Sequence, residues 1–304
     1  MTGSSVSRRS ERASKPSYDL DLPQRGDAAG APYPAIVCLH PAADASRDQY
    51  LFRHLADTLP PRGIAVARFD RRGDDVPLDV QVADLMAVVD DLQQRPGVDG
   101  GRIGLWGFSQ GAWVAPLAAS RSAKITFLVL LASTGVTPAE QMLYGTAKHA
   151  RMAGYGEDAA NRIVTVRRVV DDYRRGKASR VAAQQAIDTI RDEPFFDHAW
   201  IPASLEGAEL TWEDMDFDPE PIFAGVRVPT LLFYGEDDEW SPIDASVAAW
   251  KRAAQRARND DVTVVRLAGT GHAPTLGGAE TLAAVSPEYE RTLVAWLERV
   301  TRGG

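Results

Sequence analysis

The stretch Ile-Gly-Leu-Trp-Gly-Phe-Ser-Gln-Gly, residues 103–111, decides how the rest of this chain is interpreted. Its apolar first half, residues 103–106, predicts a short buried strand, and residues 110–120 after it predict a helix. Between the two, residues 107–111 (GFSQG) fit G-x-S-x-G, the pattern of a nucleophile elbow. A tight strand-to-helix turn of this kind lifts the serine hydroxyl above a sheet, beside the positive end of the helix dipole. We therefore expect Ser109 to be a nucleophile, the alternative being a Gly-rich turn without chemistry.

Five further short apolar runs accompany this strand. They alternate with amphipathic segments such as residues 79–95, whose apolar side chains recur at helical spacing. Continuous apolar strands separated by helices are typical of a mostly parallel sheet with helices on both faces. The sequence therefore predicts an α/β fold. The five runs are residues 35–40, 64–70, 125–133, 230–236 and 262–267.

The alternation is interrupted once, between residues 133 and 229, where no convincing strand occurs. Helical segments rich in Arg and Ala occupy this part of the chain. An insertion of about 88 residues into a strand–helix series is too long for a simple connection and predicts a helical cap, residues 137–224. Residues 1–16 are polar and small and predict a disordered tail, so the α/β domain with its cap would comprise residues 17–304.

Composition narrows the classes of partner and compartment. The chain has 304 residues, a net charge of −8, 44% hydrophobic and 25% charged residues, as expected of a globular protein. Without a basic stripe, we expect neither nucleic acid nor an anionic membrane surface as partner. No apolar run is long enough to span a membrane. The single cysteine, Cys38, excludes an internal disulfide framework. We expect a cytoplasmic protein. The sequence does not predict the oligomeric state.

A serine nucleophile needs a base and an acid that orients the base. Of five histidines, His272 lies in a Gly-Thr-Gly-His-Ala-Pro loop directly after the last predicted strand. An acid between Ser109 and His272 would complete the order serine, acid, histidine. Residues 236–239 (Glu-Asp-Asp-Glu) follow a predicted strand in that interval and offer four carboxylates.

Together these segments resemble the α/β-hydrolase fold family over about residues 17–304. Residues 39–41 (LHP) resemble the family's oxyanion loop, and residues 69–73 (FDRRG) its D-x-R-G segment. Residues 235–242 (GEDDEWSP) resemble its G-x-x-D-x-V-P loop, a match that implies Asp238 rather than Asp237 as the acid. Within the family, the chain resembles bacterial serine carboxylesterases with a helical cap, in the prolyl-oligopeptidase-like and dienelactone-hydrolase-like group.

This resemblance implies a serine hydrolase whose triad is Ser109, His272 and Asp238. It also implies an oxyanion hole with the backbone N–H of Gln110 as first donor. Where the family usually has a glycine after the strand-end histidine, this chain has Pro41, which has no N–H. We therefore expect Ala42 to supply the second donor, with Ala43 as the alternative. Neither a metal ion nor an organic cofactor is expected.

The expected reaction is hydrolysis of a carboxylic ester of a small, mostly apolar substrate. The alternatives are a thioesterase, lactonase, acyltransferase or peptidase that uses the same triad, or a binding protein without activity. Trp113 lies one helical turn after Ser109. Trp113, Tyr144 and Trp240 are the leading candidates for an apolar substrate pocket, and Trp200 and Trp212 are further candidates. Ordinary core packing is the alternative for each.

Overall fold

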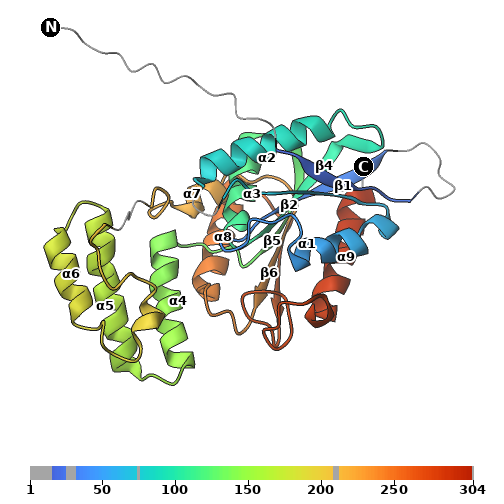
Figure 1. Cartoon of the computed structure of the whole chain (residues 1–304). Coiled ribbons are helices and arrows are strands. Elements are labelled where there is room, and N and C mark those ends of the chain that lie inside the picture. Colours follow the sequence, from blue (N-terminus) through green and yellow to red (C-terminus); the bar gives the residue numbers. More distant parts are fainter. Residues whose placement is uncertain (1–15, 25–31, 74–75, 208–211, 303–304) are drawn as a thin grey trace, which may run out of the picture.

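Seven strands form one sheet in the part of the chain that the computed structural model describes, residues 16–24, 32–73, 76–207 and 212–302. Their order is β1-β3-β2-β4-β5-β6-β7. Only β1 runs antiparallel to its neighbour, and all other adjacent pairs are parallel (Figure 1). This confirms the predicted α/β sheet. The strands are β1 (Tyr18–Asp21), β2 (Tyr33–Leu39), β3 (Ala65–Phe69), β4 (Val98–Phe108), β5 (Ile125–Leu131), β6 (Thr230–Gly235) and β7 (Val262–Leu267).

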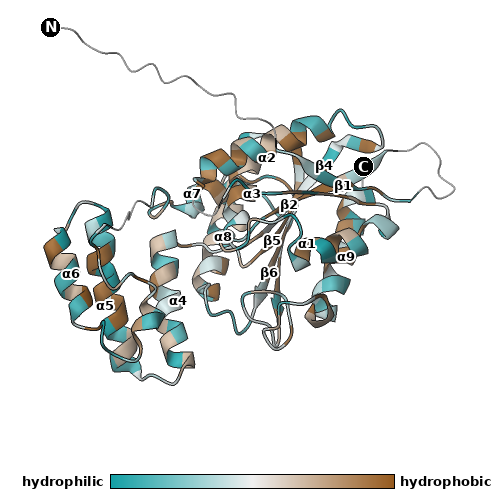
Figure 2. Cartoon of the chain, viewed as in Figure 1, coloured by the Kyte–Doolittle hydropathy of each residue, from teal (hydrophilic) through white to brown (hydrophobic). Residues whose placement is uncertain are grey.

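Helices cover both faces of the sheet and enclose a separate apolar core on each side. Along β2, Val37 and Leu39 enter the core that α2, α3 and α8 close, whereas Ile36 and Cys38 enter the core that α1 and α9 close. The central strands are accordingly mostly brown in Figure 2, the colour of apolar residues. These helices are α1 (Tyr50–Thr58), α2 (Leu78–Leu92), α3 (Gly111–Arg121), α8 (Ile243–Ala257) and α9 (Pro287–Arg302), with 3-10 turns η1 (Pro60–Arg62) and η3 (Leu282–Ala284).

Between β5 and β6 the chain leaves the sheet and forms a helical insertion. Helices α4 to α6 project to one side of the sheet (Figure 1) and have an apolar core of their own, which includes Ile163, Val166 and Val170. The last helix, α7, instead packs beside the sheet against α3 and α8. The elements are α4 (Pro138–Met152), α5 (Glu157–Arg174), α6 (Arg180–Asp188), the 3-10 turn η2 (Phe196–Ala199) and α7 (Pro219–Phe223).

The local sequence sets where this insertion begins. The Thr137 side chain accepts the N–H of Glu140, while the Glu140 carboxylate accepts the N–H of Thr137, a reciprocal capping box. Pro138 occupies the first helical position, where a missing N–H costs nothing. These signals start α4 at Pro138, with six residues between it and the end of β5. Among the described residues, no helix is both long and apolar enough to cross a membrane.

Candidate active site

Ser109 lies in the turn between β4 and α3, at the carboxyl end of a central strand. Its φ of 54° is in the left-handed region, which is costly for a residue with a side chain. The turn is so tight that a Cβ on Gly107 would lie 2.3 Å from the carbonyl oxygen of Gly111. A Cβ on Gly111 would lie 2.5 Å from the carbonyl oxygen of Leu39, in β2. The two glycines therefore permit the turn that exposes the serine hydroxyl.

His272 reaches Ser109 from the loop after β7. Its Nε2 lies 2.9 Å from Ser109 Oγ. The end of β6 supports this loop closely, since a Cβ on Gly235 would lie 2.0 Å from the carbonyl oxygen of Gly271. The backbone N–H of His272 donates to Glu239 Oε2 over 3.1 Å. Strand β6 and Glu239 thus hold the imidazole beside the serine.

Asp238 follows β6 and is fully buried. Its Oδ1 and Oδ2 lie 3.0 and 3.2 Å from His272 Nδ1, and Oδ1 also accepts the backbone N–H groups of Trp240 and Ser241. Burial opposes ionisation of the carboxyl, but the imidazole and the two N–H groups outweigh it and lower the pKa of Asp238. An ionised carboxylate only accepts, so Nδ1 carries a proton and Nε2 is free to accept one from Ser109.

The contact between Asp238 and His272 also shifts the pKa of the histidine. Burial alone would lower the pKa of His272, but the negative charge of Asp238 and its hydrogen bond outweigh burial and raise the pKa. The neighbouring Asp237, by contrast, is exposed. Of the carboxylates in this acidic run, Asp238 is therefore the one that the fold turns toward the imidazole ring. A serine, imidazole and carboxylate linked in this way can generate an alkoxide-like nucleophile.

The two residues predicted to supply oxyanion donors lie on either side of this turn. Gln110 is the residue directly before α3, and Ala42 lies in the loop that follows β2. That loop is brought next to α3 by the close approach of Gly111 to β2. Within the described part of the chain, neither backbone N–H donates a hydrogen bond. Both are therefore available to a negatively charged oxygen.

Sequence reasoning missed Arg71, whose guanidinium group connects Gln110 and Ala42. Arg71 is 7% exposed and donates to the carbonyl oxygens of Pro41 and Ala42 and to the side chain of Gln110. The only sequence signal was its place in the strand-end FDRRG segment, where Arg72 rather than Arg71 aligns with the family's arginine.

The three predicted pocket aromatics are placed differently. The Trp240 ring is half-buried beside the acid loop, with its centroid 4.4 Å from the His149 ring and 5.1 Å from the Trp200 ring. Tyr144 lies half-buried on α4. Trp113 is 6% exposed, donates its indole N–H to the Thr134 carbonyl oxygen and packs in the core. Of the three, Trp240 is the one that lies in the acid loop, where its backbone N–H donates to Asp238.

Of the two rings beside Trp240, Trp200 was a further candidate for the pocket, whereas His149 was not expected near the site. Both come from the insertion, and Trp200 is 55% exposed with a left-handed φ of 51°. The ammonium of Lys148, also on α4, donates to the backbone carbonyl oxygen of Asp238 over 3.1 Å. The insertion therefore contacts the acid loop directly.

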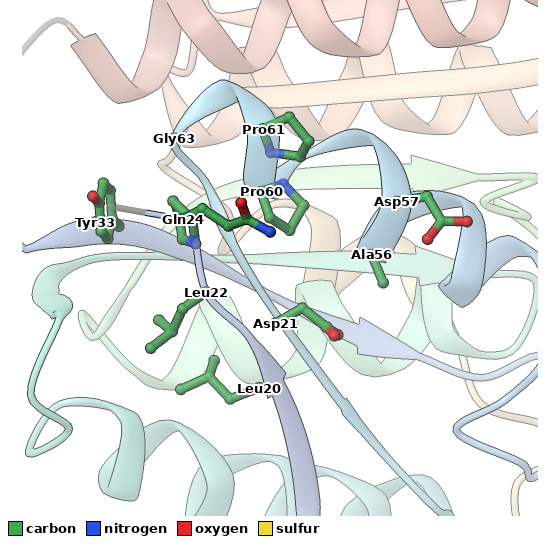
Figure 3. A pocket seen from close by; sticks show the side chains of 11 residues that line it. Leu20, Asp21, Leu22, Gln24, Tyr33, Ala56, Asp57, Pro60, Pro61 and Gly63 are labelled. Atoms are coloured by element: carbon green, nitrogen blue, oxygen red, sulfur yellow. The ribbon is translucent and has the colours of Figure 1, made fainter. Parts of the chain in front are cut away.

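A large surface hollow lies elsewhere. It measures about 890 Å³ and is lined by side chains from β1, the start of β2, and the α1–η1 region, including Tyr33, Gln24 and Pro60 (Figure 3). Tyr33 begins β2, whereas the Ser109 turn lies at the carboxyl ends of the strands, where α/β folds usually place their sites.

Across the residues described, no three His, Cys, Asp or Glu side chains gather as a metal site.

Comparison with known proteins agrees with this architecture. The structure is similar to that of the Pyrococcus furiosus esterase, with 17% identity, a TM-score of 0.57, and coverage of 88% of this chain and 82% of that chain. It is similar to Est1E from Butyrivibrio proteoclasticus, with 18% identity, a TM-score of 0.55, and coverage of 92% and 93%. It is also similar to the proline iminopeptidase of Mycobacterium smegmatis, with 17% identity, a TM-score of 0.56, and coverage of 94% and 95%.

At such low identities these likenesses concern the fold alone. No curated protein matches the chain in sequence. The family model described as "Alpha/beta hydrolase family", however, matches residues 36–285, which include the Ser109 turn, the acid loop and the histidine loop. This match covers most of the chain and agrees with the mostly parallel sheet, and the chain belongs to the alpha/beta hydrolase family.

Proposed function

We propose that this protein is a serine hydrolase that cleaves carboxylic esters of small, mostly apolar substrates through an acyl-enzyme. The observation that carries the proposal is the continuous chain of hydrogen bonds from Ser109 Oγ through His272 to Asp238, with the serine held in a strained turn. A hydroxyl alone is a weak nucleophile, and this arrangement supplies both a base and a group that orients the base.

In the proposed reaction, Ser109 Oγ attacks the ester carbonyl carbon while His272 Nε2 takes the hydroxyl proton. The carbonyl oxygen becomes an oxyanion, which accepts the N–H groups of Gln110 and Ala42, each contributing about 3 kcal/mol. His272 then gives its proton to the leaving alcohol as the carbon–oxygen bond breaks. Water attacks the acyl-enzyme, His272 takes its proton, and the acid leaves with Ser109 restored.

The preference for an apolar substrate rests on the aromatic rings beside the acid loop. Trp240 contacts His149 and Trp200, and both of these come from the insertion. We propose that residues 137–224 act as a cap whose aromatic side chains contact the acyl or alcohol group. Large rings with exposed faces suit apolar groups.

A fluorophosphonate probe read by intact mass tests the nucleophile. We expect one adduct on the wild-type protein and none on Ser109→Ala, with Ser133→Ala, a buried serine next to β5, as the matched control that still labels. Labelling of Ser109→Ala at the wild-type rate would refute the assignment.

A substrate panel tests the ester preference. It should contain p-nitrophenyl esters of increasing chain length, acyl thioesters, lactones and aminoacyl p-nitroanilides. We expect the short and medium esters to have the highest kcat/KM. If thioesters, lactones or aminoacyl amides react far faster than esters, the protein is instead a thioesterase, a lactonase or a peptidase, respectively. If the acyl group passes to an added alcohol in preference to water, the protein is an acyltransferase.

A further inference from the structure

We infer that Arg71 is the positioning residue of the oxyanion hole, holding the backbone around one proposed donor and the side chain of the other donor residue through a single guanidinium; this inference rests on the proposed function. Arg71 follows β3 and is 7% exposed. Its Nη1 donates to the Pro41 carbonyl oxygen at 2.8 Å and to Gln110 Oε1 at 2.8 Å. Its Nη2 donates to the Ala42 carbonyl oxygen at 2.6 Å.

The contact with Pro41 determines where the Ala42 N–H points. The peptide bond between these residues is trans, and a planar trans peptide directs its N–H opposite to its C=O. A guanidinium that holds the Pro41 carbonyl oxygen therefore turns the Ala42 N–H away from Arg71. By the same geometry, the contact with the Ala42 carbonyl oxygen orients the N–H of Ala43. Proline cannot donate, so the direction of the N–H groups after it decides whether a second donor exists.

The contact with Gln110 acts on the side chain of the other donor residue and leaves its backbone N–H unpaired among the described residues. Gln110 Oε1 accepts both Arg71 Nη1 and, at 3.1 Å, Gln81 Nε2. With its amide oxygen held twice, the side chain stays away from the space above Ser109. Arg71 thus links the loop after β2, the loop after β3 and the start of α3.

Arg72, the next residue in the chain, has a different hydrogen-bond partner from those of Arg71. Arg72 pairs with Asp84 on α2, and its side chain is 42% exposed. Among the described residues, the two adjacent arginines therefore have different partners: Arg71 binds groups at the site, and Arg72 binds the buried carboxylate of Asp84. This gives a matched pair of conservative substitutions, Arg71→Lys and Arg72→Lys. An ammonium keeps the charge but cannot reproduce the planar fork of donors that Arg71 uses.

The test measures transition-state stabilisation rather than stability. For Arg71→Met and Arg71→Lys we expect kcat to fall by about 10²-fold, near the effect of losing one oxyanion donor, with KM changed less than about threefold. The Ki of a trifluoromethyl ketone, whose adduct places an oxyanion in the hole, should rise by the same factor. The second-order rate of fluorophosphonate labelling should fall in parallel, while Arg72→Lys leaves all three readouts near wild type. Thermal unfolding separates these effects from loss of folding, and Arg71→Lys serves if Arg71→Met does not fold.

Two outcomes would overturn the inference. One is a folded Arg71 variant with wild-type kcat and ketone affinity. The other is a loss confined to KM, which would indicate a role in substrate binding. The labelling and ketone readouts do not depend on the natural substrate. If the wild-type protein is labelled at Ser109 but cleaves no ester, the ester proposal fails while the comparison of Arg71 variants still decides this one.

Discussion

Replacing Asp238 with asparagine tests the proposed triad sharply, because the structure determines where the new nitrogen lies. Oδ1 accepts the N–H groups of Trp240 and Ser241 at 2.8 and 2.9 Å, so the amide oxygen takes this position. The amide nitrogen then takes the position of Oδ2, 3.2 Å from His272 Nδ1. There it can only donate, which requires an accepting Nδ1. The amide oxygen also lies 3.0 Å from Nδ1, but its two lone pairs already accept the N–H groups of Trp240 and Ser241, so an accepting Nδ1 is favoured.

The consequence is the wrong tautomer in an intact loop. With Nδ1 accepting, the imidazole proton lies on Nε2, which can no longer take the proton of Ser109. The equivalent substitution in a serine protease triad lowers kcat by about 10⁴-fold, and we expect the same here, about 5.5 kcal/mol in activation free energy. Losing Asp238 also removes the charge that raises the pKa of His272, leaving burial to lower it. The residual activity should therefore have its acid limb at lower pH than the wild type.

Initial rates with p-nitrophenyl butyrate between pH 5 and 9 measure both effects, and circular dichroism confirms folding. Asp237→Asn is the matched control, because Asp237 is the adjacent, exposed carboxylate. It should remain within about twofold of wild type, as expected of a surface substitution. The reasoning is refuted if folded Asp238→Asn keeps more than about a tenth of the wild-type kcat/KM, or if Asp237→Asn causes the larger loss.

Three further outcomes are expected. In the wild-type protein, kcat/KM should fall tenfold per pH unit below the pKa of His272, which lies above its ordinary 6.5, and a plateau that continues to pH 5 would contradict this. Gly235→Ala, whose Cβ would meet a loop carbonyl oxygen at 2.0 Å, should cost about 1–3 kcal/mol in denaturant unfolding and lower kcat. Gly156→Ala, with open space around it at the N-cap of α5, should leave kcat unchanged and cost only the loss of a favoured capping residue. Cys38 is fully buried and burial raises the pKa of its thiol, so a thiol reagent should label it only after unfolding and leave activity intact; rapid labelling of the native protein would show that β2 is more open than described.

The sheet was predictable because its strands are continuous apolar runs. All six expected strands occur, and their parallel order follows from the helices between them. Strand β1 was not expected, since Tyr-Asp-Leu-Asp is four residues of alternating polarity and only its pairing with β3 makes it a strand. Helix α4 was not distinguished within the insertion, although Thr137, Pro138 and Glu140 form a capping signal that the sequence contains.

At the site, the residues that could be predicted from the sequence are the three that lie within recognisable sequence motifs. Ser109, Asp238 and His272 each lie in a loop after a strand, and parallel strands bring such loops to one edge. Arg71 and Trp200 have no motif. Arg71 acts through backbone carbonyls 29 and 30 residues away, and Trp200 reaches Trp240 only through the packing of the insertion. Contacts of that kind depend on tertiary structure that no local pattern encodes.

The separate apolar core of helices α4 to α6 has a consequence for how this enzyme can diversify. Residues such as Ile163 and Val170 stabilise the insertion without touching either core of the sheet. Substitutions in this core lie away from both cores of the sheet, so we expect their effects on stability to add to those of substitutions around Ser109 and His272. If the insertion is the cap that we propose, its interior can be remodelled to change the substrate range, while Lys148, His149 and Trp200, which meet the acid loop, have to be kept.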